Sequence, residues 1–293
     1  MLITRRIGAA ALTAAVLCAG CATSETTLVS QQSTGSAAPS ASSAAGLSRS
    51  AAPSGTDPTV SQLPVVVRRP LAGKTVGIDP GHDGGNSTDP GYLSTLVWNG
   101  RAQETCDTAG TATASGYTEA AFNFNVATDL RAELIADGAR VVMTRTTNHG
   151  VGPCVTTRAQ IINDAHANVA VDIHADGGPA TGRGFTVLEP VADGTNDKVI
   201  SSSIAFGGDV RAGMLAETTM PASNYYGSSG VVPRDDLAGL NLTTVPKILI
   251  ECGNMPNPTD ARLLTSAAYQ AQVARALAAA IVAFLTGKPI QKG

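Results

Sequence analysis

Residues 71–285 alternate short apolar segments with longer segments of helical spacing, and this alternation restricts the fold more than any other feature. The strand-like segments are residues 75–79, 140–145, 169–174, 184–188 and 247–252, and the helical segments are residues 119–137, 157–167, 204–217 and 267–285. Strands that alternate with helices predict a layered α/β fold, with helices on both faces of a single sheet. No internal repeat and no second apolar core is visible in the sequence, so we expect one domain.

The first 21 residues have the composition of an export signal. Arg5 and Arg6 precede an apolar, Ala-rich run over residues 7–21, which is too short to cross a bilayer as a permanent helix. Small residues follow, so we predict a signal peptide over residues 1–21. Residues 17–21, Leu-Cys-Ala-Gly-Cys, resemble a lipoprotein box that would place a lipid on Cys21. Ordinary signal cleavage nearby and an uncleaved anchor are the alternatives.

The next segment, residues 22–70, consists mostly of Ser, Thr, Ala, Gly, Pro and Gln. Such a composition buries too little apolar surface to offset the entropy lost on ordering, so we predict a disordered linker. The ordered domain is therefore expected over residues 71–288.

The overall charge argues against one class of partner. Lys plus Arg number 20 and Asp plus Glu number 23, which gives a net charge of −3. A nucleic-acid-binding protein carries a basic surface that this composition lacks. We expect no nucleic-acid partner, membrane attachment only through a lipid on Cys21, and a monomer.

Three strand-like segments each deliver a polar side chain of the kind that binds metals. His82 follows residues 75–79, His174 ends residues 169–174, and Glu251 lies in residues 247–252. In open α/β sheets, ligands bind beyond the carboxyl ends of the strands. Glu119 opens the first long helix, where its charge also meets the helix dipole.

Two histidines and one carboxylate, with a fourth position open, form the ligand set of a hydrolytic zinc site. A further carboxylate beside the metal is needed to move a proton to the leaving group. His82, Glu119 and His174 fit the first role, and Glu251 fits the second. Taken singly, each residue also has a structural interpretation, and the spacing alone leaves both interpretations open.

Five motifs, taken in order, resemble the zinc-dependent N-acetylmuramoyl-L-alanine amidases of the Amidase_3 family, with a long loop similar to that of actinobacterial members. The motifs are Asp79-Pro80-Gly81-His82, Glu119 with Asn123, Arg158 through Asn163, Ile173-His174-Ala175 and Ile250-Glu251-Cys252-Gly253-Asn254. A downstream run from Met255 to Leu264 fits the same family. The resemblance covers residues 71–285.

The resemblance implies a zinc amidase catalytic domain with one twisted mixed β-sheet flanked by helices. It implies that His82, Glu119 and His174 bind one Zn²⁺ per chain and that Glu251 is the catalytic acid/base. The implied reaction is hydrolysis of the amide between the lactyl group of MurNAc and L-alanine, in peptidoglycan or muropeptide fragments. The implied location is the cell envelope, outside the membrane, with residues 22–70 as a tether or a plain spacer.

The sequence departs from the family pattern in a few places. Asp172 stands where the family usually has Ser, and Asp176 where it often has Asn, so we expect local changes in hydrogen bonding. Asp83 replaces a Gly and is expected to support a metal ligand. The segment between His174 and Glu251 lacks the long helical insert of self-inhibited members, which implies activity without a partner protein.

The loop over residues 83–118 contains the only Trp, Trp98, together with Arg101. It is either a lip of the substrate groove or a surface insertion with Trp98 packed onto the domain. In an oxidising compartment Cys106 can pair with Cys154, and two free thiols are the alternative. Cys252 is expected to be a small core residue.

Two other functions compete with the amidase interpretation. One is a wall-binding module that has lost catalysis, although all four proposed site residues are present. The other is a zinc peptidase that cuts within the stem peptide, which analysis of the products would distinguish. His149 and His166 have no motif support as metal ligands.

Overall fold

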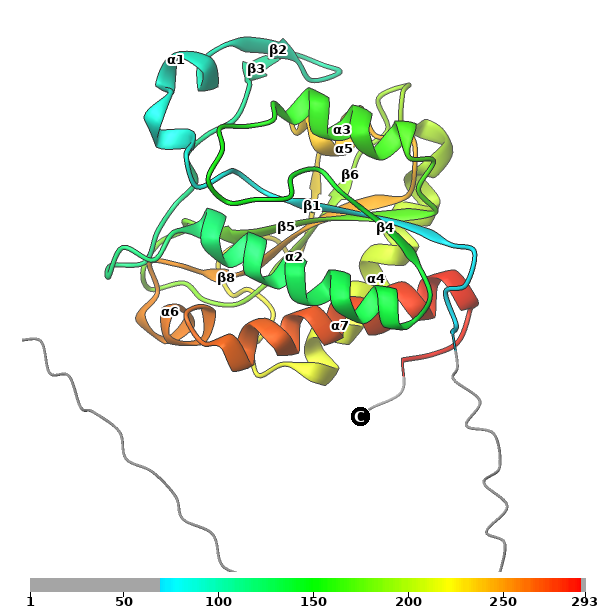
Figure 1. Cartoon of the computed structure of the whole chain (residues 1–293). Coiled ribbons are helices and arrows are strands. Elements are labelled where there is room, and N and C mark those ends of the chain that lie inside the picture. The colour runs from blue at the N-terminus through cyan, green and yellow to red at the C-terminus, as the bar shows by residue number, and fades with distance from the viewer. Residues whose placement is uncertain (1–68, 291–293) are drawn as a thin grey trace, which may run out of the picture. The chain divides into compact units, whose positions relative to one another are not determined.

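The computed structural model describes residues 69–290. The expected signal peptide, and all of the expected linker except its last two residues, lie outside the described residues. Within the described range a six-stranded sheet has the order β4-β1-β5-β8-β6-β7 (Figure 1). The strands are β1 (Thr75–Pro80), β4 (Arg140–Met143), β5 (Val169–Asp176), β6 (Thr186–Pro190), β7 (Val231–Arg234) and β8 (Lys247–Asn254).

The sheet is mixed because of a single change of direction beside β8. Pairs β1–β4, β1–β5, β5–β8 and β6–β7 are parallel, whereas β6 runs antiparallel to β8. The carboxyl ends of β1, β5 and β8 therefore meet at one edge, where an α/β fold places its ligands. The predicted fold class, one mixed α/β sheet with helices on both faces, is confirmed.

Helices cover both faces of the sheet, as the alternating pattern predicted. In Figure 1 α2 (Glu119–Ala136), α4 (Ile200–Glu217) and α7 (Ala267–Thr286) lie on one side, and α3 (Val155–Asp164) and α5 (Ala238–Asn241) lie on the other. The shorter elements are α1 (Pro90–Leu93), α6 (Pro258–Leu264) and two 3₁₀ turns, Asn86–Thr88 and Asp197–Val199.

Helix α2 follows directly from its sequence. Its apolar side chains Phe122, Val126, Leu130 and Leu134 are four residues apart, so they share one face. All four are fully buried against the sheet. The Thr118 side chain accepts a hydrogen bond from the Ala121 amide, which satisfies one of the free N–H groups at the start of the helix. This capping fixes the position of Glu119, the first residue of α2.

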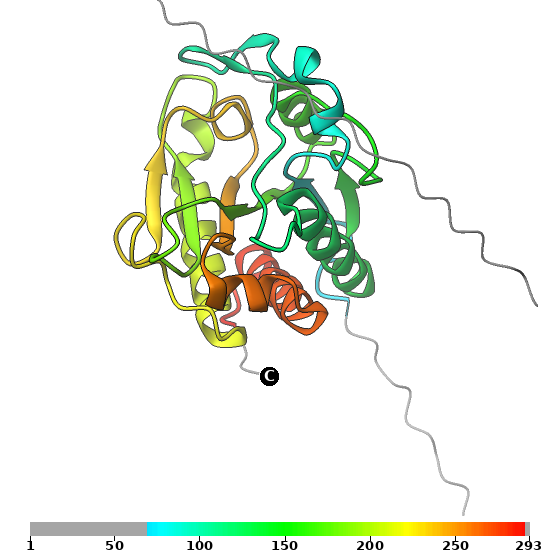
Figure 2. The ribbon, with the colours of Figure 1, turned by 90° about the vertical axis from the view of Figure 1, so that its left-hand side faces the viewer.

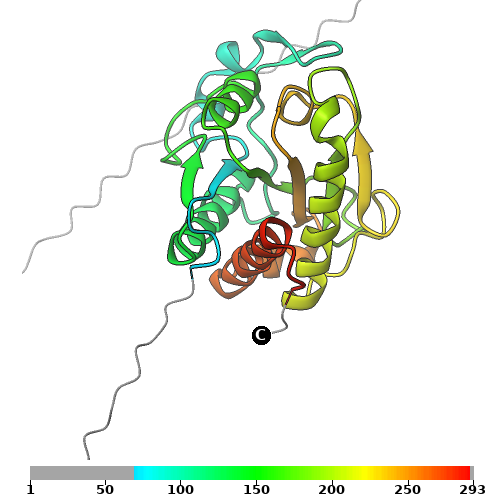
Figure 3. The same cartoon turned by 90° about the vertical axis from the view of Figure 1, so that its right-hand side faces the viewer.

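Helix α7 is long and apolar enough to cross a membrane, judged by length and composition alone. In this structure it packs against α4 and α2, and 56% of its most apolar stretch is buried. Figure 3 shows α7 beside α4. Val273, Leu277 and Ile281 are fully buried at four-residue spacing. Helix α7 is therefore the central helix of the core.

Several elements lie where the sequence predicted irregular chain. The segment 83–118 contains α1 and a two-stranded hairpin of β2 (Leu96–Trp98) and β3 (Gln103–Thr105). Figure 2 shows this hairpin at the top of the domain, beside α1. Strands of three residues are too short to display a period-two pattern, so the alternation of side chains could not reveal them.

Candidate active site

The four residues singled out from the sequence lie at one edge of the sheet. His82 follows β1, His174 belongs to β5, Glu251 belongs to β8, and Glu119 opens α2. The parallel register of β5 and β8 pairs His174 with Glu251 directly. Close parallel pairing, and not proximity in sequence, brings these two side chains together.

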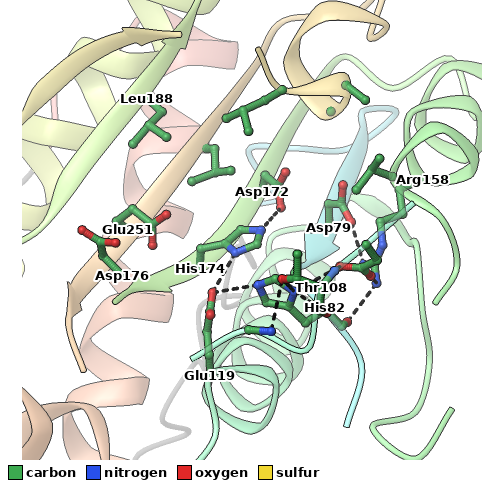
Figure 4. A pocket seen from close by; sticks show the side chains of 18 of the residues that line it. Asp79, His82, Thr108, Glu119, Arg158, Asp172, His174, Asp176, Leu188 and Glu251 are labelled. Atoms are coloured by element: carbon green, nitrogen blue, oxygen red, sulfur yellow. Dashed lines mark hydrogen bonds and ion pairs between the residues drawn. The ribbon is translucent and has the colours of Figure 1, made fainter. Parts of the chain in front are cut away.

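Glu119 lies between the two imidazoles. Its Oε1 atom is 3.2 Å from Nε2 of His82 and 2.8 Å from Nδ1 of His174 (Figure 4). One possible ligand atom from each of the three residues lies within 4.8 Å of the others. Two imidazole nitrogens and a carboxylate oxygen form the donor set that hydrolytic zinc sites use. The three residues therefore fit a divalent metal ion both in chemistry and in spacing.

Two glycines allow this close approach. A Cβ atom at Gly81 would lie 2.2 Å from the His174 ring, and one at Gly110 would lie 2.7 Å from Cδ2 of His82. His82 itself has a φ of 57°, a left-handed conformation that non-glycine residues adopt infrequently. The turn after β1 thus holds His82 in an uncommon backbone conformation at the site.

Each imidazole also faces a carboxylate on the side away from Glu119. Nδ1 of His82 lies 3.1 Å from Oδ1 of Asp107 and 3.0 Å from the carbonyl oxygen of Thr108. Nε2 of His174 lies 3.3 Å from Oδ1 of Asp172, an ion-pair distance without the angle of a hydrogen bond. Such partners orient the rings of metal-binding histidines.

The sequence assigned this supporting role to Asp83, and that prediction is wrong. The Asp83 side chain accepts a hydrogen bond from the Gly150 amide, so it anchors the loop after β4. Asp107 holds His82 instead, from 25 residues further along the chain. Nothing in the local sequence around Asp107 indicates this contact, because the intervening hairpin creates it.

A buried ionic network supports the site from beneath. Asp79 accepts hydrogen bonds from Lys247 Nζ at 2.8 Å and from Arg158 Nη1 at 3.1 Å. Arg158 also lies 3.3 Å from Oδ2 of Asp107, and Lys247 lies 3.6 Å from Oδ2 of Asp172. The network therefore reaches both carboxylates that face the imidazoles.

The charges around the triad favour a cation. Burial alone would lower the pKa of His82, but Glu119 and Asp107 outweigh burial and raise that pKa to about 9. Burial would also raise the pKa of Glu119, yet the two imidazoles hold it well below the ordinary value. A site that stabilises protonated imidazole and ionised carboxylate is suited to hold a positive ion.

Glu251 behaves differently from Glu119. Burial of its carboxylate is the main cause that raises its pKa to about 8, and the nearby carboxylates of Glu119 and Asp176 add to the effect. Its Oε2 atom is buried and has no hydrogen-bond partner among the described residues. Figure 4 shows Glu251 beside Asp176. A carboxyl group with a pKa near neutrality can both accept and donate a proton.

These groups line one pocket of about 430 Å³. Its lining includes the triad, Glu251, Arg234 and Leu237. The hairpin strand β3 contributes Glu104 and Thr105 to the same pocket. The pocket is large enough for a small ligand.

Comparison with known proteins identifies the family of the domain that contains this pocket. The family model for Amidase_3, described as N-acetylmuramoyl-L-alanine amidase, matches residues 76–283, from β1 almost to the end of α7. The chain belongs to the Amidase_3 family of N-acetylmuramoyl-L-alanine amidases. It is accordingly a hydrolase.

Mycobacterial relatives agree with this assignment. An N-acetylmuramoyl-L-alanine amidase of Mycobacterium tuberculosis is 41% identical over 216 residues, which cover 73% of this chain and 88% of the relative. The crystal structure of the amidase Ami1 of Mycobacterium smegmatis is 39% identical, with a TM-score of 0.70, and covers 74% of this chain and 99% of that one. Ami1 of Mycobacterium abscessus is 37% identical, with a TM-score of 0.68 and coverage of 73% and 100%.

The amidase contains the predicted disulfide between Cys106 and Cys154, whose Cα atoms are 4.7 Å apart. The bond joins the end of the hairpin to the residue that precedes α3. Cys252 is a free, buried thiol whose pKa is raised well above its ordinary value, chiefly by burial. A nucleophilic cysteine has a lowered pKa, so Cys252 is a core residue, as predicted.

The amidase structure also shows where several other loop side chains lie. Trp98 is 54% exposed, so the interpretation in which it packs onto the domain is wrong. His149 and His166 are both exposed and lie outside the triad. Arg234 lines the pocket and donates to Asp236, and Arg101 donates to the carbonyl oxygen of Ala192.

Proposed function

We propose that this amidase hydrolyses the amide between the MurNAc lactyl group and L-alanine with one Zn²⁺ per chain. In this proposal His82, Glu119 and His174 hold the ion, and Glu251 is the catalytic acid/base. The observation that carries it is the convergence of three donor atoms within 4.8 Å beside a buried carboxylate. When bound in such a site, zinc acidifies a water molecule and polarises the carbonyl group that is attacked.

Zinc is favoured over other ions by the chemistry of the donors. Imidazole suits zinc, whereas Ca²⁺ and Mg²⁺ prefer sites made of oxygen atoms. Three protein ligands leave a position open, which is the arrangement of catalytic and not of structural zinc sites. Asp107 and Asp172 orient His82 and His174 so that one nitrogen of each ring faces Glu119.

Glu251 is suited to move the proton that amide hydrolysis requires. The attacking water must lose a proton, and the leaving nitrogen of L-alanine must gain one. A single carboxylate can perform both transfers if its pKa lies near the working pH. Burial holds the pKa of Glu251 above its ordinary value, in the direction that this dual role requires. The buried and unpartnered Oε2 atom is free to accept the proton.

We further propose the location and organisation that the sequence indicated. Residues 1–21 are a signal peptide, residues 22–70 a linker, and residues 71–288 the catalytic domain. The protein is exported to the cell envelope, where a lipid on Cys21 attaches it to the outer face of the membrane and peptidoglycan or muropeptide fragments are its substrates. It acts as a monomer without an activating partner and binds no nucleic acid.

Product analysis tests the reaction. Purified protein is incubated with a disaccharide muropeptide, with and without a chelator, and the products are identified by mass spectrometry. The proposal expects a free lactyl carboxylate on the sugar and a free amino group on L-alanine, both lost with the chelator and restored by added zinc. Cleavage within the stem peptide would refute it in favour of a peptidase, and absence of cleavage would leave only a wall-binding role.

A further inference from the structure

The β2–β3 hairpin carries two exposed apolar side chains on its uncharged outer face, which no described part of the chain covers. Leu96 and Trp98 are 64% and 54% exposed, respectively. The antiparallel register pairs Leu96 with Thr105 and Trp98 with Gln103, so these four side chains share one face of the hairpin, its outer face. Val97 and Glu104 occupy the other face and are half-buried.

The hairpin is fastened to the domain from its inner side. The Glu104 carboxylate accepts a hydrogen bond from the Ala238 amide at 3.1 Å, and the Asn99 side chain donates to the Asp236 carbonyl oxygen at 3.1 Å. The Cys106–Cys154 disulfide holds the end of β3. The outer face is therefore a fixed platform, and the exposure of Trp98 is a stable feature of the fold. An exposed Trp beside an exposed Leu on such a platform offers a surface for a ligand with an apolar face.

This outer face borders the active-site pocket at the end of β3. Thr105 belongs to the outer face and also lines the pocket. Trp98 lies opposite Gln103, two residues from Thr105, which corresponds to about 7 Å along a strand. A polymer whose reacting bond lies in the pocket can reach this face by passing over the rim at Thr105.

We propose that Trp98, with Leu96 and Gln103, binds a sugar ring of the glycan strand next to the MurNAc residue whose amide is cleaved. This inference rests on the proposed function and specifies its substrate, a glycan polymer in preference to a single-sugar fragment. A sugar ring presents C–H groups on its faces and hydroxyl groups around its edge. The indole ring of Trp98 suits the faces, and the Gln103 amide supplies both donors and acceptors for the hydroxyls.

Charge favours a sugar over an anionic membrane surface. The four side chains of the outer face are uncharged, as are the glycan rings beyond the lactyl group. Proteins that bind anionic lipids place Lys or Arg beside the inserted aromatic side chain. The one cation of the hairpin turn, Arg101, is held away by its hydrogen bond to the Ala192 carbonyl oxygen and its ion pair with Asp235 at 3.8 Å.

Two substrates separate this role from catalysis. The full-length protein and its Trp98→Ala variant are assayed on insoluble peptidoglycan and on a muramoyl dipeptide with one sugar ring. We expect the ratio of kcat/KM on polymer to kcat/KM on fragment to fall about tenfold in the variant, the typical effect of removing a Trp anchor. Trp98→Phe keeps an aromatic ring, so its ratio of kcat/KM on polymer to kcat/KM on fragment should stay close to that of the unmodified protein.

Ile135→Ala is the matched control. Ile135 is 46% exposed and lies on α2, 16 residues after Glu119, about 24 Å away along the helix. For Ile135→Ala, the ratio of kcat/KM on polymer to kcat/KM on fragment should equal that of the unmodified protein. An unchanged ratio in Trp98→Ala, or an equal loss on both substrates, would overturn the glycan role.

A binding measurement keeps the inference separate from the proposed function. Glycan strands stripped of stem peptides are sedimented with each variant, and no amide cleavage is involved. Weaker sedimentation of Trp98→Ala than of Ile135→Ala supports the inference even if the amide reaction fails. Trp98-dependent binding to phosphatidylglycerol vesicles, with unchanged binding to glycan, would overturn it in favour of a lipid surface.

Discussion

Nζ of Lys247 lies 2.8 Å from Oδ2 of Asp79, and the two residues are separated by 168 positions in the chain. Neither side chain is more than 2% exposed. Burial would raise the pKa of Asp79, yet Lys247 and Arg158 hold it far below its ordinary value. The middle of the sheet therefore contains a compensated charge cluster directly beneath the edge that carries the triad.

Replacing Lys247 by Met should destabilise the fold strongly. The substitution leaves Asp79 with Arg158 as its remaining cation and removes the Lys247 ammonium from Asp172. Breaking a buried ion pair costs about 3 kcal/mol or more. Urea unfolding at neutral pH measures the loss. Lys198→Met, at an exposed position, should change stability by less than about 0.5 kcal/mol.

The loss in Lys247→Met should depend on pH. The depressed pKa of Asp79 means that its charge stabilises the unmodified fold above the unfolded pKa, 3.8, and that this stabilisation fades as the pH falls. In the variant, protonation of Asp79 removes an uncompensated charge. The difference between the two proteins should therefore shrink as the pH approaches 3.8, and a constant difference would contradict the role of the pair.

His174→Ala should abolish metal binding. The substitution removes one of three donors, and two donors do not hold a catalytic ion at ordinary concentrations. We expect about one zinc ion per chain in the unmodified protein and a small fraction of that in the variant, measured by elemental analysis after dialysis. His149→Ala, which removes an exposed imidazole, should retain the full amount.

Asp107→Asn should weaken metal affinity by about 10- to 100-fold, the typical effect of removing the partner of a metal-binding histidine. The amide keeps the size of the carboxylate but loses the charge that faces Nδ1 of His82. Competition with a chromophoric chelator gives the affinity. Asp129→Asn on the exposed face of α2 is the control, and equal affinities in the two variants would show that Asp107 is not a support for His82.

Glu251→Gln should lose turnover by about 100-fold or more and keep its zinc, because the amide cannot transfer a proton but leaves the three donors intact. Activity on a muropeptide and metal content are measured on the same sample. Glu133→Gln, on the surface of α2, should match the unmodified protein in both. A variant at position 251 with substantial activity would remove Glu251 from the mechanism.

Loss of the Cys106–Cys154 bond should lower the free energy of unfolding by about 2–4 kcal/mol, since the bond closes a loop of 48 residues. The double variant with serine at both positions tests this by thermal unfolding. Limited proteolysis should then cut within residues 84–118 faster than in the oxidised protein. Equal cleavage rates would show that the hairpin is held by its hydrogen bonds alone.

The sequence predicted best where a pattern extends over many residues. Helices α2 and α7 and strands β5 and β8 show clear periodicity or long apolar runs, so their existence and the layered α/β fold could be predicted. His82, Glu119 and His174 converge as the motif order implied. Their roles stay predictions until the metal and the reaction are measured.

The supporting residues could not be predicted in the same way. Asp107 reaches His82 only because the hairpin folds back over the pocket, and a three-residue strand leaves no periodic signal. Asp83 was chosen for its proximity to His82 in sequence, but its backbone position directs the carboxylate to Gly150. The exposure of Trp98 likewise depends on which face of a short strand turns outward.

Arg158 has a consequence for any attempt to transplant the turn that carries His82. Its guanidinium donates to the carbonyl oxygens of Pro80, His82 and Pro153, so a side chain from α3 determines the path of the irregular segment that carries His82. A lysine lacks the planar fork that directs N–H groups at three separate carbonyl oxygens in fixed directions. Grafting the turn onto another scaffold would therefore require an arginine whose guanidinium reaches the same carbonyl groups. Without that side chain, the residues of the turn do not determine its backbone conformation.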